Sequence, residues 1–365
     1  MRPDLDDTTM GRQVVHPGSK RRCSSRGKSS KWSQLPTDLI ELVLKKLPTI
    51  MDIMRIKAVC SPWRSTAKSY TSSPYHSPPQ NPCIMFLMKV KDDEIWHRRY
   101  RSCVYDPIGN TVYQLRTVFS CFPFSRCMGS SYGWLLFFNE SSCIVGLYNP
   151  ISRARFRLPF FRELSRIRYC SSPLKAIVSF DPSSNKNFVV ALVVGGDILF
   201  YKHNVKAWTE LENSYRFTEI MFHNDHLYSL TSKGSSLAVW DCRKWPPVTS
   251  MRFKGSIPEG KIHRSYLAKS ITGEVLRVVK LDDNKKPRVL VQKLDTSHVR
   301  WETVETLSDQ VLFVIQKKAI SLLRLDISGC EEYSVYDFPI IDHASCDVRS
   351  GYYPSLKPFW FIPTC

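Results

Sequence analysis

Apolar residues recur at helical spacing in a short region near the start of the chain. Residues 38–47 predict an amphipathic helix whose apolar positions form two adjacent stripes: Leu39, Val43 and Leu47, and Ile40 and Leu44. We expect Thr37 to cap this helix, Asp38 to complement the positive end of its dipole, and Pro48 to end it. Such an apolar face is wider than a small module can cover by itself.

Two further short helices are expected after the first. One begins at Asp52 and carries apolar residues as far as Cys60, and the other begins at Ser61-Pro62, with Ser61 as its cap. The three helices form a module over residues 32–69, followed by a linker over residues 70–82 that is rich in serine and proline. A unit of below about 40 residues usually needs a partner to be stable. Its surplus apolar surface therefore predicts binding to another protein's helices.

From residue 83 onward, the pattern changes to short strand candidates separated by turn residues. The clearest candidates are residues 84–90, 134–138, 176–180, 188–194, 217–222, 275–281, 289–294 and 310–315. One short helical turn is expected within residues 161–168. We therefore expect an α+β chain in which a small helical module precedes an all-β domain over residues 83–365.

A weak internal repeat runs through this β-rich part. An aromatic residue or leucine is followed by a polar residue and a turn at Tyr105-Asp106, Tyr148-Asn149, Tyr201-Lys202, Trp240-Asp241, Leu294-Asp295 and Tyr336-Asp337. A second aromatic residue follows several of these turns, at Tyr113, Phe156, Trp208 and Trp301. The steps of about 40–50 residues match the period of a propeller blade, so the repeat predicts a β-propeller.

The helical module resembles the F-box. The resemblance is carried by Trp32, Leu35-Pro36, Asp38-Leu39-Ile40, Val43-Leu44, Leu47, Asp52-Ile53, Arg55, and Ala58-Val59-Cys60 followed by Trp63-Arg64. It implies docking onto a Skp-type adaptor and, through it, onto a cullin and RING ubiquitin ligase. By matching position, it also implies an adaptor-binding surface made by Leu35, Pro36, Leu39, Ile40, Val43, Leu44, Leu47, Val59, Cys60 and Trp63.

The remainder resembles plant F-box proteins that carry a KIB-type β-propeller. The resemblance rests on the order of several motifs, among them Gly133-Trp134-Leu135, Leu147-Tyr148-Asn149-Pro150, Lys293-Leu294-Asp295 and Pro358-Phe359-Trp360-Phe361. One departure lies between Val314 and Ser334, where this chain is shorter than the family pattern and lacks an Asn-x-Ile-Tyr-Phe-like signature. This departure predicts an incomplete late blade.

Charge adds two basic regions to this picture. The 365 residues carry a formal net charge of +19, which favours acidic partners in general. Residues 1–31 are expected to form a disordered basic tail, and an alternative interpretation is a nuclear-import patch at Lys20, Arg21, Arg22, Arg26 and Lys28. A second basic stretch, from Arg153 to Lys175, fits the solvated face of a strand, an acidic protein segment or nucleic acid; we favour them in that order.

Other sequence features indicate where the protein works. The longest apolar run, residues 188–194, is too short to span a bilayer, and no secretory signal precedes the module. The 12 cysteines form no CxxC pair, so we expect reduced, mostly buried thiols in the nucleus or cytoplasm.

Candidate catalytic and metal-binding patterns are weak. Residues 129–133 match the GxSxG string, with Ser131 as the nucleophile of a hypothetical propeller hydrolase. An apolar strand rather than a helix follows, so we expect a turn. His223 and His226 offer two metal ligands, but the Asn-Asp pair between them favours a hairpin. We expect no cofactor and no metal.

Three functions compete on this basis. The first is a substrate-recognition subunit that bridges an adaptor and an unknown protein target and has no catalytic residue of its own. The second is a basic nucleic-acid-binding protein or a scaffold unconnected to a ligase. The third is the propeller hydrolase. The sequence favours the first, and it does not identify the target, since loops make a propeller's binding faces.

Overall fold

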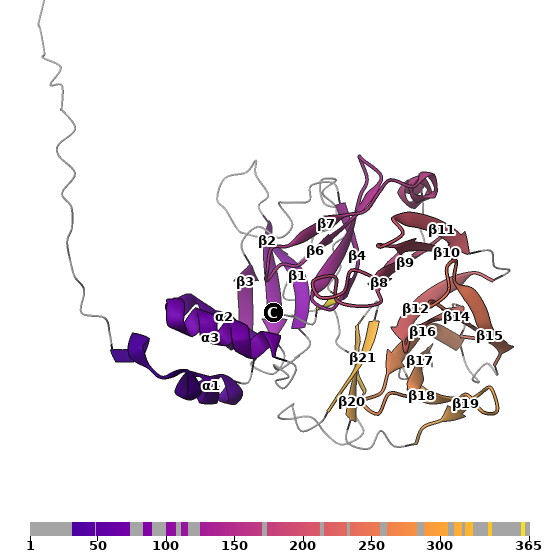
Figure 1. The fold of residues 1–365 in the computed structure, drawn as a ribbon. Coiled ribbons are helices and arrows are strands. Elements are labelled where there is room, and N and C mark those ends of the chain that lie inside the picture. The colour runs from indigo at the N-terminus through magenta and orange to yellow at the C-terminus, as the bar shows by residue number, and fades with distance from the viewer. Residues whose placement is uncertain are drawn as a thin grey trace, which may run out of the picture.

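A computed structural model gives the fold of a helical module followed by a ring of β-sheets (Figure 1). It describes residues 31–47, 49–73, 83–89, 100–106, 111–115, 125–169, 174–211, 215–231, 234–255, 261–282, 288–305, 310–315, 318–323, 335–337 and 359–361. Almost all of the predicted basic tail, including the candidate import patch, lies outside these residues. No helix in the described part of the chain has the length and apolar character needed to cross a membrane.

The module consists of a 3-10 helix and three α-helices. Their bounds are η1 Lys31–Gln34, α1 Thr37–Lys46, α2 Ile50–Val59 and α3 Ser61–Ser72. Pro36 and Cys60, rather than the predicted Thr37 and Ser61, are the residues that precede α1 and α3. Only α2 has a side-chain cap, because the Thr49 hydroxyl accepts a hydrogen bond from the Asp52 backbone N–H at 3.2 Å.

One small core holds the three helices together. It is made by Ile40, Leu44, Ile53, Trp63, Ala67 and Tyr70. The Trp63 indole N–H donates to the Trp32 carbonyl at 2.8 Å, which ties η1 to α3. Because Tyr70 packs into this core, α3 continues to Ser72, and the predicted linker begins three residues later than expected.

The first three sheets hold the early strands and the end of the chain. Their strands are β23 Phe359–Phe361, β1 Cys83–Lys89, β2 Tyr100–Asp106 and β3 Thr111–Leu115; β4 Ser125–Ser131, β5 Trp134–Asn139, β6 Ile144–Tyr148 and β7 Arg155–Arg157; and β8 Lys175–Val178, β9 Val189–Val194, β10 Asp197–Lys202 and β11 Ala207–Leu211. We number these sheets as blades 1 to 3. A 3-10 helix, η2 Arg162–Tyr169, connects blades 2 and 3 where a helical turn was expected.

Blades 4 and 5 complete the set of four-stranded sheets, and a sixth sheet is smaller. Their strands are β12 Phe217–His223, β13 His226–Thr231, β14 Ser236–Asp241 and β15 Val248–Lys254; β16 Lys261–Lys269, β17 Val275–Asp282, β18 Arg288–Asp295 and β19 Arg300–Thr303; and β20 Gln310–Ile315, β21 Lys318–Leu323 and β22 Val335–Asp337. The predicted fold class is therefore confirmed, with five four-stranded blades.

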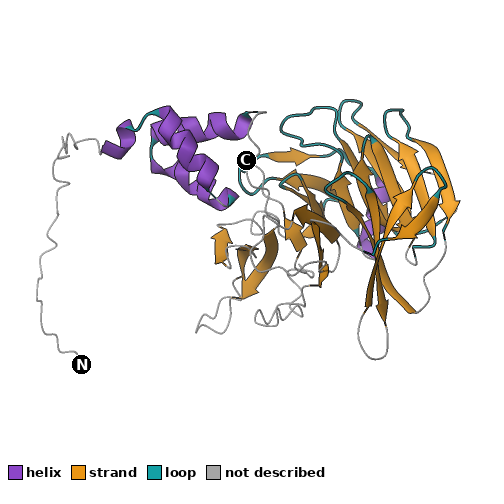
Figure 2. Cartoon of the chain, turned by 90° about the horizontal axis from the view of Figure 1, so that it is seen from below, coloured by secondary structure: helices purple, strands orange, loops and turns teal. Residues whose placement is uncertain are grey.

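The late sheet differs from the other blades in its described part, while most of the stretch from Val314 to Ser334, on which the prediction of an incomplete blade depends, lies outside the described residues. The described part of this sheet has three strands, and β22 runs parallel to β20 instead of antiparallel. Blade 1 is completed by the end of the chain, because β23 pairs antiparallel with β1. One strand of each sheet contacts one strand of the following sheet, in the order β23, β4, β8, β12, β16 and β21. These contacts arrange the sheets around a common axis (Figures 1 and 2).

Apolar side chains fill the space between successive blades. In β9, Val190, Leu192 and Val194 pack toward blade 2, while the alternating residues Val189, Ala191 and Val193 pack toward blade 4. Every residue of β9 is buried. Since successive side chains of a strand point to opposite faces, a strand covered on both sides reads as a continuous apolar run.

The internal repeat marks the third strand of each four-stranded blade. Tyr105, Tyr148, Tyr201, Trp240 and Leu294 lie near the ends of β2, β6, β10, β14 and β18. The polar residue that follows often closes the next turn: the Asn149 side-chain oxygen accepts from the backbone N–H groups of Ile151 and Ser152, both at 2.9 Å, and Asp295 does the same for Ser297 at 2.9 Å. Such side chains mimic a backbone turn, so the polar residue recurs for a structural reason.

Cysteines in the described part of the chain are free thiols. Cys83, Cys103, Cys143 and Cys242 are buried, and burial raises the pKa of both Cys83 and Cys242 to about 12. Thiols held in this protonated state are poor nucleophiles.

A buried arginine connects blades 4 and 5. Arg277 of β17 is 0% exposed, and its guanidinium donates to the Gln292 side-chain oxygen at 2.9 Å and to the Gly234 carbonyl at 2.5 Å. It also lies over the Trp301 ring, 4.7 Å from the ring centroid. Burial lowers its pKa to about 10, so it stays charged at neutral pH.

Replacing this arginine should weaken the propeller. We expect Arg277→Ala to lower the free energy of unfolding by about 3 kcal/mol, because two buried oxygens lose their donor. Urea unfolding would measure the change. Arg288→Ala, at an exposed position of the adjacent strand, should change it by less than about 0.5 kcal/mol. Equal effects of the two substitutions would contradict the structural role of Arg277.

The helical module offers a matched pair of neighbouring residues. Ile40 is 1% exposed and Leu39 is 47% exposed. We expect Ile40→Ala to destabilise the module by about 3 kcal/mol through loss of packing, and Leu39→Ala to do so by less than about 1 kcal/mol. Thermal unfolding followed by circular dichroism would compare them. A larger effect at Leu39 would show that the two faces of α1 are assigned the wrong way round.

Candidate functional site

The helical module exposes apolar side chains that its own core does not use. Leu39, Leu42 and Val43 of α1 are 47%, 55% and 37% exposed, and Val59 at the end of α2 is 58% exposed. The three α1 residues stand at spacings of three and four, so they share one face of the helix. We call Leu39, Leu42, Val43 and Val59 the apolar helix face. Trp32 of η1, 69% exposed, adds a further large apolar side chain.

The structure divides the ten predicted adaptor-binding residues into three groups. Pro36, Leu39, Val43 and Val59 are exposed, and Leu35, Leu47 and Cys60 are partly buried. Ile40, Leu44 and Trp63 lie in the core of the module, so in the free chain their side chains hold the helices together and do not form part of its surface. Leu42 was not predicted, although its spacing from Leu39 places it on the same helix face.

The two stripes of α1 therefore have different surroundings. Ile40 and Leu44 face α2 and α3, whereas Leu39 and Val43 face away from the core. A helix that is apolar on both sides needs cover on both sides, and the module covers one. This arrangement provides a ready surface for a second protein.

A short chain of polar contacts reaches from the module to blade 1. The Thr49 hydroxyl donates to the Asp52 carboxylate at 2.7 Å, and Arg55 pairs with the same carboxylate at 2.7 Å. The Arg55 guanidinium lies over the ring of Tyr113 in β3, 5.0 Å from its centroid. Asp52 thus orients an arginine that touches the propeller, and Figure 1 shows the helices beside blade 1.

The GxSxG string forms a tight hairpin turn. Ser131 ends β4, Tyr132 and Gly133 adopt positive φ angles of 50° and 71°, and β5 begins at Trp134. The Ser131 hydroxyl accepts a hydrogen bond from the Val178 backbone N–H at 3.3 Å. A nucleophile elbow requires a helix directly after the serine, so the expected turn is the correct interpretation here.

The histidine pair also lies on a hairpin. Asn224 and Asp225 form the two-residue turn between β12 and β13, with φ angles of 45° and 57°, and His223 pairs with His226 across it. Within the described residues, no group of three or more His, Cys, Asp or Glu side chains is placed to hold a metal ion.

The basic stretch does not act as one surface. Arg155 and Arg157 are exposed on β7, as expected for the wet face of a strand. Arg166 binds the carboxylates of Asp197 and Glu210 at 3.4 and 2.7 Å. Lys175 is buried in an ion pair with Glu219 of β12, next to the axis of the ring. Desolvation lowers the pKa of this lysine and raises that of its glutamate.

Comparison with known proteins supports both parts of this arrangement. Residues 32–72 match the F-box domain, and residues 104–353 match the KIB1-4 beta-propeller. The F-box/kelch-repeat protein KIB1 of Arabidopsis thaliana is 25% identical over 82% of this chain and 78% of its own length. The F-box protein KIB3 of the same plant is 25% identical over 76% of this chain and 65% of its own length.

Similarity to solved structures is much weaker. The apo form of AztD from Citrobacter koseri matches with a TM-score of 0.37 and 12% identity, over 67% of this chain and 61% of its own. A score this low supports no argument about function. The KIB1-4 match, by contrast, covers well over half of the sequence, and with its F-box helices and its ring of blades this chain belongs to the KIB1-4 β-propeller family of F-box proteins.

Proposed function

We propose that this chain is the substrate-recognition subunit of a Skp–cullin–F-box ubiquitin ligase. In this role the helical module docks onto a Skp-type adaptor, and the propeller holds a protein target. The observation that carries the proposal is the apolar helix face, which the module leaves uncovered although it belongs to an F-box. Interfaces of this kind are built from an amphipathic helix set against apolar side chains of a partner.

In this mechanism the protein positions a target and catalyses no step itself. A receptor that binds adaptor and target at once raises the effective concentration of the target at the transferring enzyme. F-box/kelch-type proteins are typically non-catalytic adaptors, and this chain needs no catalytic residue in such a role. The contact between Arg55 and Tyr113 supports the proposal because it links the adaptor-binding part to the target-binding part.

The proposed function also gives a role to the buried residues of the F-box. Ile40, Leu44 and Trp63 keep the helices in the geometry that presents Leu39, Leu42 and Val43. We infer that they support adaptor binding indirectly, through the fold of the module. The nucleus and the cytoplasm are the proposed locations, in line with the basic tail and the absence of a CxxC pair.

A nucleic-acid-binding role has less support. It depends on the stretch from Arg153 to Lys175, where Arg166 is paired with two carboxylates and Lys175 is buried with Glu219. These internal pairs remove basic groups from the surface that nucleic acid would contact.

Charges on the apolar helix face should abolish adaptor binding. We expect Leu39→Asp/Val43→Asp to weaken binding to a purified Skp-type adaptor at least thirty-fold, because two carboxylates would be buried in an apolar interface. Co-purification and calorimetric titration would measure this loss. The helix content should stay unchanged in circular dichroism, since both side chains are already exposed.

Val248→Asp provides the matched control. Val248 lies in β15 of blade 4 and is 49% exposed. This substitution changes an exposed valine to the same acid far along the chain from the helices, and it should leave adaptor binding unchanged. Adaptor binding of wild-type strength by the double variant would remove the proposed function.

A further inference from the structure

Among the residues that the structure describes, one face of the propeller carries most of the exposed large apolar residues found in turns. In a four-stranded blade, the turn after the first strand and the turn after the third strand lie at the same end of the sheet. We call the surface made by these turns the turn face. Its exposed large apolar residues are Tyr132, Phe180, Val205, Ile271 and Val299. They come from blades 2, 3 and 5, so the apolar character extends across the face.

One of these side chains, that of Tyr132, is held in place by a hydrogen bond. Tyr132 has a left-handed backbone with a φ of 50°, and its phenol donates to the Ser179 carbonyl at 3.0 Å. This bond fixes an exposed aromatic ring of blade 2 against the turn of blade 3 that contains Phe180. Val299 is a β-branched residue with a φ of 52°, a conformation that is a genuine outlier for such a side chain. Retained backbone strain of this kind is typical of functional surfaces.

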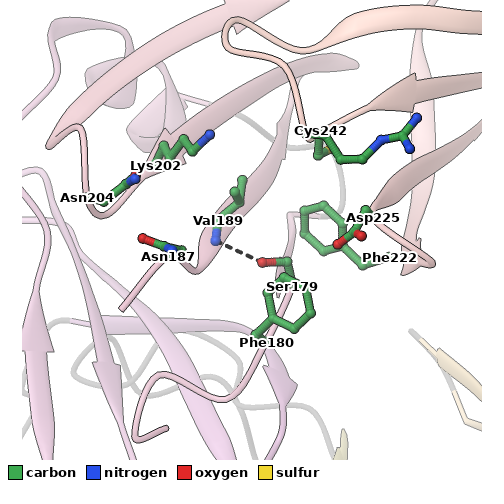
Figure 3. A pocket seen from close by; sticks show the side chains of 10 residues that line it. Ser179, Phe180, Asn187, Val189, Lys202, Asn204, Phe222, Asp225 and Cys242 are labelled. Carbon is green, nitrogen blue, oxygen red and sulfur yellow. Dashed lines mark hydrogen bonds between the residues drawn. The ribbon is translucent and has the colours of Figure 1, made fainter. Parts of the chain in front are cut away.

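A pocket opens on the turn face between blades 3 and 4 (Figure 3). Its volume is about 190 Å³, and Val189 and Phe222 give it apolar lining. The wall beside Phe180 is rigid, because the Val189 backbone N–H donates to the Ser179 hydroxyl at 2.8 Å. Pockets for drug-sized ligands usually measure about 300–1,000 Å³, so this one suits a single side chain of a larger partner.

Polar groups surround the apolar lining. Lys202 reaches into the pocket from blade 3, and Asn187 and Asn204 contribute amides from turns of the same blade (Figure 3). Asp225 lies on the opposite side, on blade 4. Arg243 is fixed by two bonds of 2.9 Å to the carboxylate of Asp241. Side-chain amides of this type can bind the backbone of an extended peptide, since each offers a donor and an acceptor.

The charge of this region is positive. The turns and strand ends around the pocket contain five Lys or Arg residues and three Asp residues: Lys186, Lys202, Lys206, Arg243, Lys244, Asp181, Asp225 and Asp241. Arg243 and Asp241 pair with each other, which leaves four Lys residues against Asp181 and Asp225. The remaining excess of cations attracts an anionic partner.

We propose that the pocket between blades 3 and 4 binds an acidic segment of a partner protein. One apolar side chain of the segment enters between Val189 and Phe222, and a neighbouring carboxylate pairs with the Lys202 ammonium. Phe180 and Tyr132 extend the contact toward blade 2. The identity of the partner as the ubiquitination target rests on the proposed function, whereas the peptide chemistry of the site rests on the pocket itself.

The test uses full-length protein, with and without a Skp-type adaptor, and three fluorescein-labelled peptides. These are Gly-Glu-Asp-Leu-Asp-Glu-Gly, its neutral analogue Gly-Gln-Asn-Leu-Asn-Gln-Gly and its basic analogue Gly-Lys-Lys-Leu-Lys-Lys-Gly. Fluorescence anisotropy should show the acidic peptide binding at least ten-fold more tightly than either analogue. Its affinity should fall as salt rises, because an exposed ion pair is screened.

Variants locate the binding on the molecule. Lys202→Met removes the charge and keeps an aliphatic stem against Trp245, whose ring lies 5.7 Å from the ammonium. It should weaken the acidic peptide about ten-fold, and Lys202→Arg should retain binding. Lys254→Met is the control, since Lys254 is exposed and ends β15 at the opposite end of blade 4, away from the half-buried Lys202. It should leave the affinity unchanged.

Two results would overturn this proposal. One is equal affinity for the acidic, neutral and basic peptides, and the other is an equal loss of binding in Lys202→Met and Lys254→Met. Adaptor binding is measured on the same samples, so the two proposals fail separately. If the protein binds the adaptor but not the acidic peptide, only the assignment of the pocket is wrong. A chain that binds the peptide but no adaptor removes the ligase role alone.

Discussion

Strands covered by apolar side chains on both faces are the constraint on which this structure depends. In β9, alternating residues pack against blade 2 and against blade 4, so a single strand belongs to two cores at once. No blade between two others can form a stable unit by itself, because each exposes apolar area until its neighbours arrive. The turns at the two ends of the blades are therefore held on a rigid frame, which is what a binding face requires.

The helical module, by contrast, is covered by its own side chains on one side only. Its core is small, and α1 has apolar side chains on the side that faces the core and on the side that faces away from it. The propeller satisfies its surplus apolar surface internally by adding blades, whereas the module leaves part of that surface exposed. This contrast separates a part of the chain that leaves apolar side chains exposed from a part whose sheets cover one another.

Much of the fold could be predicted from the sequence because it depends on local patterns. The eight clearest strand candidates all correspond to observed strands, and the repeat at Tyr105, Tyr148 and Tyr201 marks the third strand of successive blades. Helix starts were misplaced by a residue or two, since Thr37 and Ser61 are good caps that the chain uses as first helical residues instead. Local propensity alone does not decide between these adjacent positions.

The candidate sites were less predictable, because they depend on which side of an element is covered. The motif places Ile40 and Trp63 in the F-box, but only the packing of three helices shows that both are buried. The pocket between blades 3 and 4 brings Val189, Lys202 and Phe222 together from three strands. The spacing of these residues along the sequence does not predict that they line one pocket, because their proximity depends on the strand register and on the rotation between neighbouring sheets.

The pairing of β23 with β1 has a consequence for the order in which the protein matures on the ribosome. Blades 2 to 5 are each built from a continuous segment, so they can assemble in turn as the chain emerges. Blade 1 takes one of its strands from Phe359–Phe361, so it remains open until this segment has been made, after all of blades 2 to 5. The helices of the module precede blades 1 to 5 in the chain, so they are made well before the ring beside them has closed.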